Sequence, residues 1–372
     1  MHPPLQGVRI LDLTRVLAGP LATMTLGDLG ADVIKVERPG LGDETRAWGP
    51  PFDSRGESAY YLSINRNKLS IALDVNAPTD LATLRILLDG AHAVLDNFRP
   101  GTLERRGLDI AAILERQPHL VWCTLTGFGP DSERPGYDFV VQAESGWMAI
   151  TGEPDGAPMK VGVALADVLA GKDAALAVVA GLSVRGTARP ASARRVFVSL
   201  FHSAVGALVN VAQNALVTGR EALRWGNAHA NLVPYQLFLA ADRPIVIAVG
   251  NDVQWRSCTR ALQLDALGAD GRLATNAGRL QHRQQVVEAI STRVRERPAA
   301  QWLEALAAVG VPAGVVHSVR EALATVNASE LTGVAPSAPG TVRLPPPRLD
   351  EHGGLVRRFG WDAFRHTGAE QN

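Results

Sequence analysis

The sequence predicts an α/β protein whose first 130 residues form an open, doubly wound parallel sheet. The segments "GVRILDLT", "ADVIKVERP", "KLSIALDV", "HAVLDNF" and "LVWCTLTGFG" are short runs rich in Val, Ile and Leu, which is typical of buried strands. The segments "GPLATMTLGDLG", "APTDLATLRILLDGA" and "IAAILERQ" between them have helical spacing. Because strands alternate with helices, right-handed parallel crossovers are expected.

Two further regions follow the strand-rich part. From about 160 to 220 the chain favours helix, and "FVSLFHSAVGALVNVAQNALVTG" predicts one long buried helix that ends at Gly219. "PYQLFLAADRPIVIAVGND" predicts two strands joined by a turn, and "DVQWRSCTRALQ", "RQQVVEAISTRVRE" and "AAQWLEALAAVG" predict helices. With "VPAGVVHSVREAL" they indicate a smaller α+β domain over residues 225–325. The proline-rich "RLPPPRLDEHGG" is typical of a linker.

The composition argues against several classes of protein. The 372 residues include 37 Lys+Arg and 37 Asp+Glu, so no excess positive charge is present to attract nucleic acid. Cys123 and Cys258 are the only cysteines, and their spacing favours a reducing, cytoplasmic location without a disulfide or a metal site. The first residues lack a signal-peptide pattern, and the apolar runs are too interrupted for a membrane span, so we expect no membrane partner.

The segment after the first strand does not predict a dinucleotide site. "LAGPLATMTLG" lacks the GxGxxG spacing, and no GxxxxGK[ST] sequence is present. A doubly wound fold alone therefore gives no reason to expect a nicotinamide cofactor.

One carboxylate lies within an unusually apolar stretch. Asp167 belongs to "VGVALADVLAGKDAALAVVAGL", residues 161–182, and the three residues on either side of it are all Ala, Leu or Val. Burying an unpaired charge is unfavourable by several kcal/mol. Three interpretations stay open from the residues alone: Asp167 faces solvent, it is paired or caps a helix, or it is functional. Asp173, beside Lys172, is expected to face water.

Longer stretches resemble a known family. "DLTRVLAGPLATMTLGDLGADVIKVERPGLGDETRAWGPPF", "SINRNKLSIALD", "LDNFRPGTLERRGLD", "RPGYDFVVQAESGWMAITGEPDGAPMKVGVALADVLAG" and "RWGNAHANLVPYQLF" resemble the class III CoA-transferase family, also called the carnitine dehydratase/formyl-CoA transferase family. The resemblance implies a large α/β CoA-binding domain formed by both chain ends, residues 1–200 and 326–372. It also implies a linker helix over 201–224, a small domain over 225–325, and two chains threaded through each other as an interlocked homodimer.

The resemblance also implies a reaction. Asp167 matches the family's catalytic nucleophile, which attacks an acyl-CoA thioester and then carries CoA as an aspartyl-CoA thioester before a carboxylic acid accepts it. A coenzyme A thioester is then a substrate, and no permanently bound cofactor is expected. An acyl anhydride must be kept from water, so we expect apolar walls from Val163, Ala164 and Leu165.

Further site residues follow from the same resemblance. The positions that match CoA-binding residues are Arg38, Lys68, Asn97, Phe98 and Arg105. The positions expected near the acyl groups are Leu17, Tyr137 and Asp138, with Gly250 and Asn251 of "AVGND" as N–H donors to an oxyanion. An ordinary loop at "AVGND" is an equally open interpretation.

Differences within the family narrow the reaction. Related racemases have His where this chain has Tyr137, and formyl-CoA transferases have Gln where it has Leu17. The remaining resemblance is to enzymes that move CoA between succinate and other dicarboxylates, with Arg224, His229 and Asn231 near a distal carboxylate; His229 as a purely structural residue stays open. The alternatives are an acyl-CoA racemase or epimerase and a non-catalytic acyl-CoA-binding homologue. "DEHGG" departs from the family pattern and leaves the role of the C-terminal segment open.

Overall fold

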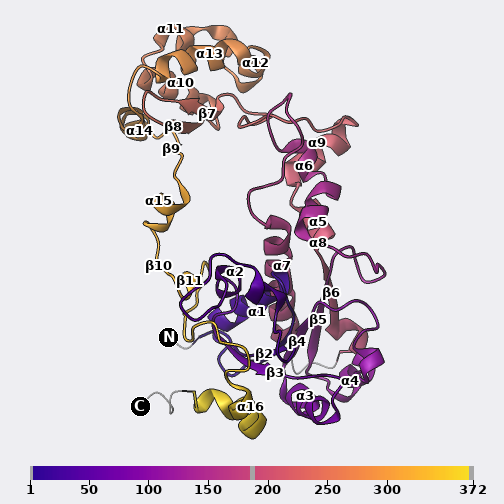
Figure 1. Cartoon of the computed structure of the whole chain (residues 1–372). Coiled ribbons are helices and arrows are strands. Elements are labelled where there is room, and N and C mark those ends of the chain that lie inside the picture. Colours follow the sequence, from indigo (N-terminus) through magenta and orange to yellow (C-terminus); the bar gives the residue numbers. More distant parts are fainter. Residues whose placement is uncertain (1–2, 185–188, 368–372) are drawn as a thin grey trace. The chain divides into compact units, whose positions relative to one another are not determined.

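The computed structural model describes residues 3–184 and 189–367 (Figure 1). The chain forms two compact units, and each is described by itself. The first unit contains the residues up to Met148, Lys160–Arg220 and those from Val326 onward, so that N-terminal and C-terminal segments share it. The second unit contains Ala149–Met159 and Glu221–Thr325. Residues 149–159 therefore belong to the second unit and not to the large domain, in which the resemblance places them.

A six-stranded parallel sheet forms the centre of the first unit, with the order β3-β2-β1-β4-β5-β6. The strands are β1 (Arg9–Leu13), β2 (Asp32–Glu37), β3 (Lys68–Ala72), β4 (Ala93–Asp96), β5 (Val121–Thr126) and β6 (Arg195–Ser199). The predicted α/β fold with a parallel sheet is confirmed. The strand order reverses between β1 and β4, and at such a point the carboxyl ends of the strands border a crevice where α/β proteins bind ligands.

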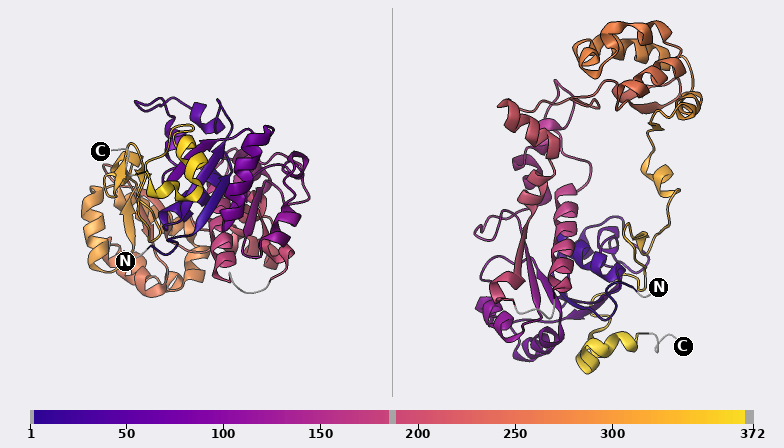
Figure 2. Two further views of the ribbon diagram at one scale, coloured as in Figure 1. Left: turned by 90° about the horizontal axis from the view of Figure 1, so that it is seen from below. Right: turned by 180° about the vertical axis from the view of Figure 1, so that it is seen from behind.

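Helices cover both faces of this sheet. Successive side chains on a strand point to opposite faces, so Ile10 and Leu11 of β1 belong to different apolar clusters. The cluster with Ile10 includes residues of α1 (Ala18–Asp28) and α7 (Leu165–Ser183), which cover one face of the sheet. The cluster with Leu11 includes residues of α3 (Pro78–Gly90), α4 (Ile110–Arg116) and α16 (Gly353–Phe359), which cover the other face (Figure 2). Burial on both faces explains why the strands read as nearly continuous apolar runs.

The remaining elements of this part of the chain are short. They are α2 (Ala59–Leu62), α5 (Asp138–Glu144), α6 (Trp147–Ile150), α8 (Leu200–Gly206), α9 (Val209–Thr218), β10 (Ala328–Ser329), β11 (Gly333–Val334) and the 3-10 helices η1 (Glu44–Ala47), η2 (Glu104–Arg106), η3 (Ala191–Arg194) and η5 (Gly360–Arg365).

The prediction of one long buried helix over residues 197–219 is wrong. The segment continues β6 and then forms α8 and α9, which are bent by 72° relative to each other. Val209, at the break, has a φ of 42°, which is incompatible with a continuous helix. The ten residues of α9 lie within the described part of the chain and none is buried; Leu216 and Val217 are 77% and 75% exposed. Gly219 does end α9, in the left-handed conformation.

Among the residues that the structure describes, no single helix is long and apolar enough to cross a bilayer. The bent pair α8 and α9 reaches the necessary length and composition only when its two helices are taken together.

The C-terminal segment covers the edge of the sheet. Asp350 Oδ1 accepts a hydrogen bond from Ala72 N of the edge strand β3 at 2.7 Å, and His352 N donates to Ser70 O at 3.0 Å. A Cβ at Gly353 would lie 2.1 Å from Asp350 Oδ1, so glycine fits this position best. The "DEHGG" sequence thus pairs with an otherwise open strand edge, which gives the segment a structural role.

The second unit is built on a three-stranded antiparallel sheet with the order β7-β8-β9. Its elements are β7 (Tyr235–Leu239), β8 (Pro244–Ala248), α10 (Asp252–Ala261), α11 (Asp265–Ala269), η4 (Gly271–Leu273), α12 (Asn276–Gln281), α13 (Arg283–Val294), α14 (Ala299–Ala308), β9 (Ala313–Val315) and α15 (Val319–Leu323). Trp255, Trp302 and Ile290 are fully buried in its core. The two strands and three helices expected from the sequence are all present.

Candidate functional site

Asp167 lies in the first turn of α7, and a side chain from α5 caps that turn. The N-cap residue is Ala164, whose side chain cannot accept a hydrogen bond from the first free N–H groups. Asp138 Oδ1 instead accepts from Ala166 N at 2.8 Å and from Asp167 N at 3.4 Å. Asp138 Oδ2 accepts from Gln142 Nε2 at 2.7 Å. Asp138 therefore fixes the start of α7, and a substrate in contact with it would compete with these bonds.

The surroundings of Asp167 hold its carboxyl close to half-ionised at neutral pH. Burial, followed by the negative charge of Asp138, raises the pKa of Asp167 from its ordinary 3.8 to about 7. The backbone N–H of Ala18, the first residue of α1, donates toward the carboxyl and acts in the opposite direction. The amino-terminal ends of α1 and α7 thus both border Asp167, and helix amino termini stabilise anions. A Cβ at Gly171 would lie 2.6 Å from Ala18 O, so glycine permits this close approach.

The apolar walls predicted around Asp167 are only partly present. Ala166 and Ala170 are fully buried beside it, and Ala164 and Leu165 are half-buried. The prediction for Val163 is not met in the single chain, because its side chain is 59% exposed.

Tyr60, on α2, also faces this site. Burial and then the charges of Asp167 and Asp138 raise the pKa of the Tyr60 phenol to about 12. The hydroxyl therefore remains protonated and able to donate a hydrogen bond at any ordinary pH. The Tyr60 ring makes an edge contact with Trp48, with ring centroids 5.1 Å apart.

Lys68 does not fit its predicted role as a CoA contact. Its side chain is fully buried, and Nζ donates to Asp12 Oδ2 at 3.0 Å, Pro20 O at 2.9 Å and Asn65 Oδ1 at 2.9 Å. Burial lowers the pKa of Lys68 to about 8, against the opposing effect of Asp12. Three protein acceptors use all three ammonium protons, so no donor remains for a phosphate. Lys68 therefore has a structural role, because it links β1, α1 and the start of β3.

The other four predicted CoA-binding residues lie on the loops that leave the carboxyl ends of β2 and β4. Arg38 follows β2 and is exposed, with no guanidinium hydrogen bond to any described residue. Arg105 is exposed, and its Nη2 donates to Thr102 Oγ1 at 3.2 Å. Phe98 is half-buried against the apolar cluster that contains α3. Asn97 uses its side-chain amide on the backbone of Arg15, donating to O at 2.8 Å and accepting from N at 3.2 Å.

A small cavity of about 90 Å³ lies at the carboxyl ends of β4 and β5, beside the first half of β6. Its lining residues include Phe98, Arg99, Thr126 and Arg195. Asp96, at its floor, accepts hydrogen bonds from Trp122 Nε1 and Thr124 Oγ1, both at 2.7 Å. The cavity thus adjoins two arginines and one of the residues expected to contact CoA.

Leu17 and Tyr137 both stand immediately before a helix. Leu17 is half-buried and precedes α1, with its carbonyl accepting from Leu21 N at 2.8 Å. Tyr137 precedes α5 and is 59% exposed. Each is one residue from a group that acts on Asp167, Leu17 from Ala18 and Tyr137 from Asp138. Their roles in substrate binding stay predictions.

The "AVGND" turn of the second unit forms an ordinary helix cap. Asn251 is the N-cap of α10, and its Oδ1 accepts from Gln254 N at 2.9 Å. Gly250 N donates to Gln254 Oε1 at 2.8 Å. The N–H group expected to bind an oxyanion is therefore paired within the turn, as in the alternative interpretation, and the substrate contact of Gly250 and Asn251 stays a prediction.

Arg224 does not have the predicted freedom to bind a distal carboxylate. Its guanidinium donates to three backbone carbonyls, those of Ala149, Glu153 and Gly156. It therefore holds the segment 149–159 within the second unit. His229 Nδ1 accepts from Asn231 N at 3.0 Å, which agrees with the structural interpretation of that histidine.

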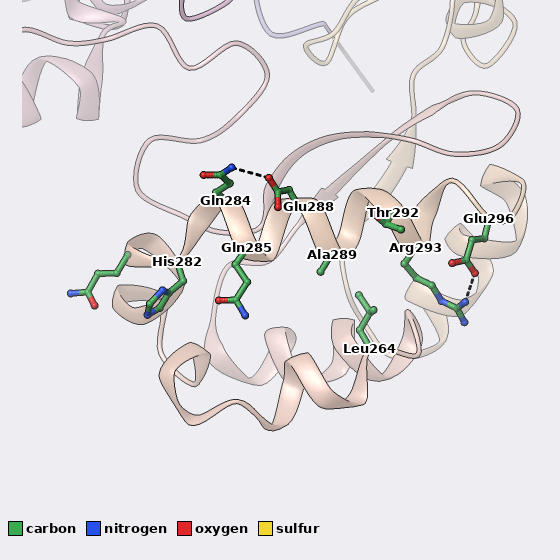
Figure 3. Close-up of a pocket in the computed structure, with 10 residues that line it drawn as sticks. Leu264, His282, Gln284, Gln285, Glu288, Ala289, Thr292, Arg293 and Glu296 are labelled. Atoms are coloured by element: carbon green, nitrogen blue, oxygen red, sulfur yellow. Dashed lines mark hydrogen bonds and ion pairs between the residues drawn. The ribbon is translucent and has the colours of Figure 1, made fainter.

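A surface hollow also lies in the second unit, along α13 (Figure 3). It has a volume of about 760 Å³, and Gln285, Glu288, Arg293 and Glu296 are among the side chains that line it. Glu288 and Glu296 are paired with neighbouring residues of the same helix or its end, as on many solvated helices. The hollow contains none of the predicted site residues. Among the residues that the structure describes, no group of three His, Cys, Asp or Glu side chains is arranged for a metal ion.

Several residues around the site had not been identified from the sequence. Asp12 and Lys35 left a signal, because each places a charge within a run that reads as a buried strand and so requires a partner. Tyr60 left none, because it adjoins the core residue Tyr61 and resembles it in every local respect. Asp43 caps η1 and is part of an unremarkable turn sequence, "GLGDET".

The chain is similar to known CoA-transferases over most of its length. A family model described as CoA-transferase family III matches residues 5–353. The succinyl-CoA:glutarate CoA-transferase of Mus musculus is 44% identical over 321 residues, covering 86% of this chain and 73% of the mouse protein. The succinate–glutarate CoA-transferase of Agrobacterium fabrum is 42% identical over 330 residues, covering 87% of this chain and 82% of that protein.

A solved structure has the same fold. The crystal structure of a CAIB/BAIF family protein from Brucella suis superimposes with a TM-score of 0.81 at 36% sequence identity. The match covers 96% of this chain and 99% of the Brucella chain.

Proposed function

The chain belongs to CoA-transferase family III, and we propose that it transfers CoA from succinyl-CoA to a second dicarboxylic acid, with glutarate as the first candidate. The observation that carries the catalytic part of the proposal is the partly buried carboxyl of Asp167 between two helix amino termini. The substrate part is supported by relatives in two distant organisms whose names specify succinate and glutarate.

In the proposed reaction, a carboxylate oxygen of Asp167 attacks the thioester carbonyl carbon of the donor. The carbon–sulfur bond breaks, CoA leaves as the thiolate, and a mixed anhydride remains on Asp167. The thiolate then attacks the Asp167 carbonyl carbon, and the donor acid leaves with the bridging oxygen. The acceptor carboxylate repeats these steps in reverse order from the aspartyl-CoA thioester, and it leaves as a new CoA thioester.

The surroundings of Asp167 suit a carboxylate nucleophile. A carboxylate is weakly nucleophilic in water, and partial burial removes solvent that would have to be displaced before attack. A pKa of about 7 leaves a substantial ionised fraction at neutral pH while making the carboxylate more basic than an exposed aspartate. The charges of Asp167 and Asp138 reach the protonated Tyr60 hydroxyl, and we propose that this hydroxyl stabilises the oxyanion formed during attack.

We place the CoA nucleotide at the reversal of strand order, outside β1 and β4. Arg38 and Arg105 are exposed on the loops there, and guanidinium groups suit phosphate oxygens. Phe98 offers a ring edge beside the small cavity. Asn97 contributes by holding the loop after β1 in place.

A homodimer is also proposed, interlocked as the sequence resemblance implies. Large apolar side chains of α5, α8 and α9 are exposed in the single chain, including Phe139, Val205, Val209, Leu216 and Val217. Large apolar side chains exposed on neighbouring helices often mark a protein interface. A second copy of the chain is the occupant that we propose. Size-exclusion chromatography with light scattering should give twice the mass of one chain, and a monomer would contradict the proposal.

The racemase alternative has less support. Exchange of an α-proton requires two acid–base groups on opposite faces of the substrate, and the chain has Tyr137 where those relatives have histidine. A non-catalytic acyl-CoA-binding protein would not need Asp167. The cytoplasmic location stays a prediction, consistent with the buried free thiols of Cys123 and Cys258.

The test combines turnover with isotope labelling. Purified protein is incubated with succinyl-CoA and a panel of dicarboxylates, and the CoA esters are separated by mass spectrometry. With oxygen-18 glutarate, one labelled oxygen should enter the peptide that contains Asp167 during turnover. Transfer without labelling of Asp167 would contradict the anhydride route, and absence of transfer to any acid would contradict the function.

A matched pair of variants completes the test. Asp167→Asn should abolish transfer and labelling. Asp173→Asn makes the same change on the same helix, but Asp173 is exposed. Its carboxyl accepts a hydrogen bond from Ser203 Oγ at 2.6 Å. This control should keep activity close to that of the unmodified protein.

A further inference from the structure

The loop between β1 and α1 has its backbone fixed by side chains of several strands. Asp12 Oδ1 accepts from Thr14 N at 2.9 Å, and Lys35 Nζ donates to Thr14 O at 2.8 Å. Asn97 binds both the N–H and the C=O of Arg15. Because backbone groups on successive residues are held in this way, the chain enters α1 along one defined path.

Val16, in this loop, has a strained backbone conformation. Its φ is 72°, in the left-handed region that β-branched residues avoid. Its N–H donates to Asp43 Oδ1 at 3.2 Å. Asp43 is 3% exposed, and Lys35 Nζ holds its other oxygen at 3.0 Å. Strain of this kind persists only where the surroundings impose it, and the buried Lys35–Asp43 pair is the group in direct contact with the Val16 N–H.

The conformation of Val16 determines where the next residues point. Val16 stands two residues before Ala18, whose N–H donates toward the Asp167 carboxyl. Gly19 packs against the start of the same loop, because a Cβ there would lie 2.3 Å from Thr14 Cβ. The loop is therefore a tight turn, and relaxation of Val16 to a negative φ would redirect the Ala18 N–H.

We propose that Asp43, oriented by Lys35, is a positioning residue for Asp167: by holding Val16 in the left-handed conformation it aims the Ala18 N–H at the Asp167 carboxyl. Asp43 acts through the loop and has no direct part in the reaction. The inference rests on the proposed function of Asp167 as the nucleophile, and it adds a buried ion pair to the parts of the molecule that set its reactivity.

Other charged and titratable groups face these two carboxyls. Asp138 and Tyr60 face Asp167, and Ala18 provides its N–H donor. Glu37 Oε2 accepts from Asp43 N at 3.0 Å, beside Lys35. Loss of the negative charge of Asp43 by itself would lower the pKa of nearby acids. Loss of the Ala18 N–H would raise the pKa of Asp167, so the two effects of changing Asp43 have opposite signs.

The experiment measures the ionisation of Asp167 without any substrate. A carbodiimide activates the protonated carboxyl and an added amine traps it as an amide, and peptide mass spectrometry gives the labelled fraction of Asp167 at each pH. In Asp43→Ala the labelling midpoint should rise by about one pH unit, as expected when a carboxylate loses one N–H donor. An unchanged or lower midpoint would overturn the proposal.

A second substitution tests the route through Val16. Glycine adopts a left-handed φ without a side-chain penalty, so Val16→Gly in the Asp43→Ala background should return the midpoint toward that of the unmodified protein. Persistence of the raised midpoint in the double variant would show that Asp43 acts by another route. If Asp43→Ala does not fold, Asp43→Asn keeps the Oδ1 acceptor and should not raise the midpoint; a rise would contradict the proposal.

A control removes a comparable ion pair at the other end of α1. Asp28 is 5% exposed and pairs with Arg66 at 2.7 Å, so Asp28→Ala has a similar effect on packing. It should leave the Asp167 midpoint unchanged, and an equal shift in this control would mean that general loosening explains both. Because labelling needs no CoA ester, failure of the proposed transfer activity would be seen separately, in the unmodified protein.

Discussion

Replacement of Asp167 by asparagine should make the protein more stable, and the gain should depend on pH. The folded pKa of Asp167 is about 7, above its ordinary value of 3.8. Between these two values the folded chain holds a proton on Asp167 that the unfolded chain has already released. The unfolded state then binds fewer protons than the folded state, so the free energy of unfolding falls as pH rises through this window.

The size of the effect follows from the width of the window. A difference of about three pH units corresponds to about 4 kcal/mol by which ionised Asp167 destabilises the fold above pH 7, as an upper limit. At about pH 5 only about 2 kcal/mol of this destabilisation has developed. Asparagine has nearly the same shape and does not ionise. The stability advantage of Asp167→Asn should therefore grow by about 2 to 3 kcal/mol from pH 5 to pH 8.5.

Urea denaturation followed by circular dichroism measures this difference at fixed protein concentration, which matters because dimerisation would also change apparent stability. Asp173→Asn serves as the control for removal of one negative charge from α7. A stability difference between Asp167→Asn and the unmodified protein that is the same at both pH values would refute the reasoning. So would a variant that is less stable at pH 8.5.

Three further outcomes are expected. Asp138→Asn removes the second-largest cause of the raised Asp167 pKa, so the acid limb of the kcat/KM profile for CoA transfer should move to lower pH; no movement would show that Asp138 acts only as a cap. Lys68→Met should lower stability by about 3 to 5 kcal/mol in urea denaturation, because it leaves the buried Asp12 charge without its partner. Arg105→Ala should raise the KM for the CoA ester several-fold while leaving the urea midpoint unchanged. If instead Lys68→Met raises that KM and keeps its stability, and Arg105→Ala leaves the KM unchanged, Lys68 would again be a candidate CoA contact.

The fold was predictable because the strands of a parallel sheet are buried on both faces. Five of the six strands read as short apolar runs, and their alternation with helices fixed the parallel crossovers. The prediction of one long buried helix in place of α8 and α9 failed because apolar composition was misleading there. Their apolar composition gives the same signal, but Leu216 and Val217 are exposed, and composition alone does not determine which apolar side chains a fold buries.

The site was predictable only in part, for a related reason. A resemblance transfers the identity of residues but not the reason for which each is needed. Lys68 and Arg105 both lie in matching motifs, yet the ammonium group of Lys68 binds three protein acceptors, whereas Arg105 is exposed. The Val16 conformation has no sequence signal at all, because the preference of valine is for the extended region and only the fold overrides it.

Asp138 shows how capping and reactivity are joined in this site. A serine or threonine at the same place would satisfy the free N–H groups of Ala166 and Asp167 about as well as a carboxylate does. Neither would add a negative charge beside Asp167. The aspartate therefore destabilises ionised Asp167 while it stabilises the helix that carries it, and Ala18 moderates the first effect with a single N–H. The pKa near neutrality is set first by burial and then by these two opposed contacts, so a change at either contact should move the pH at which Asp167 ionises.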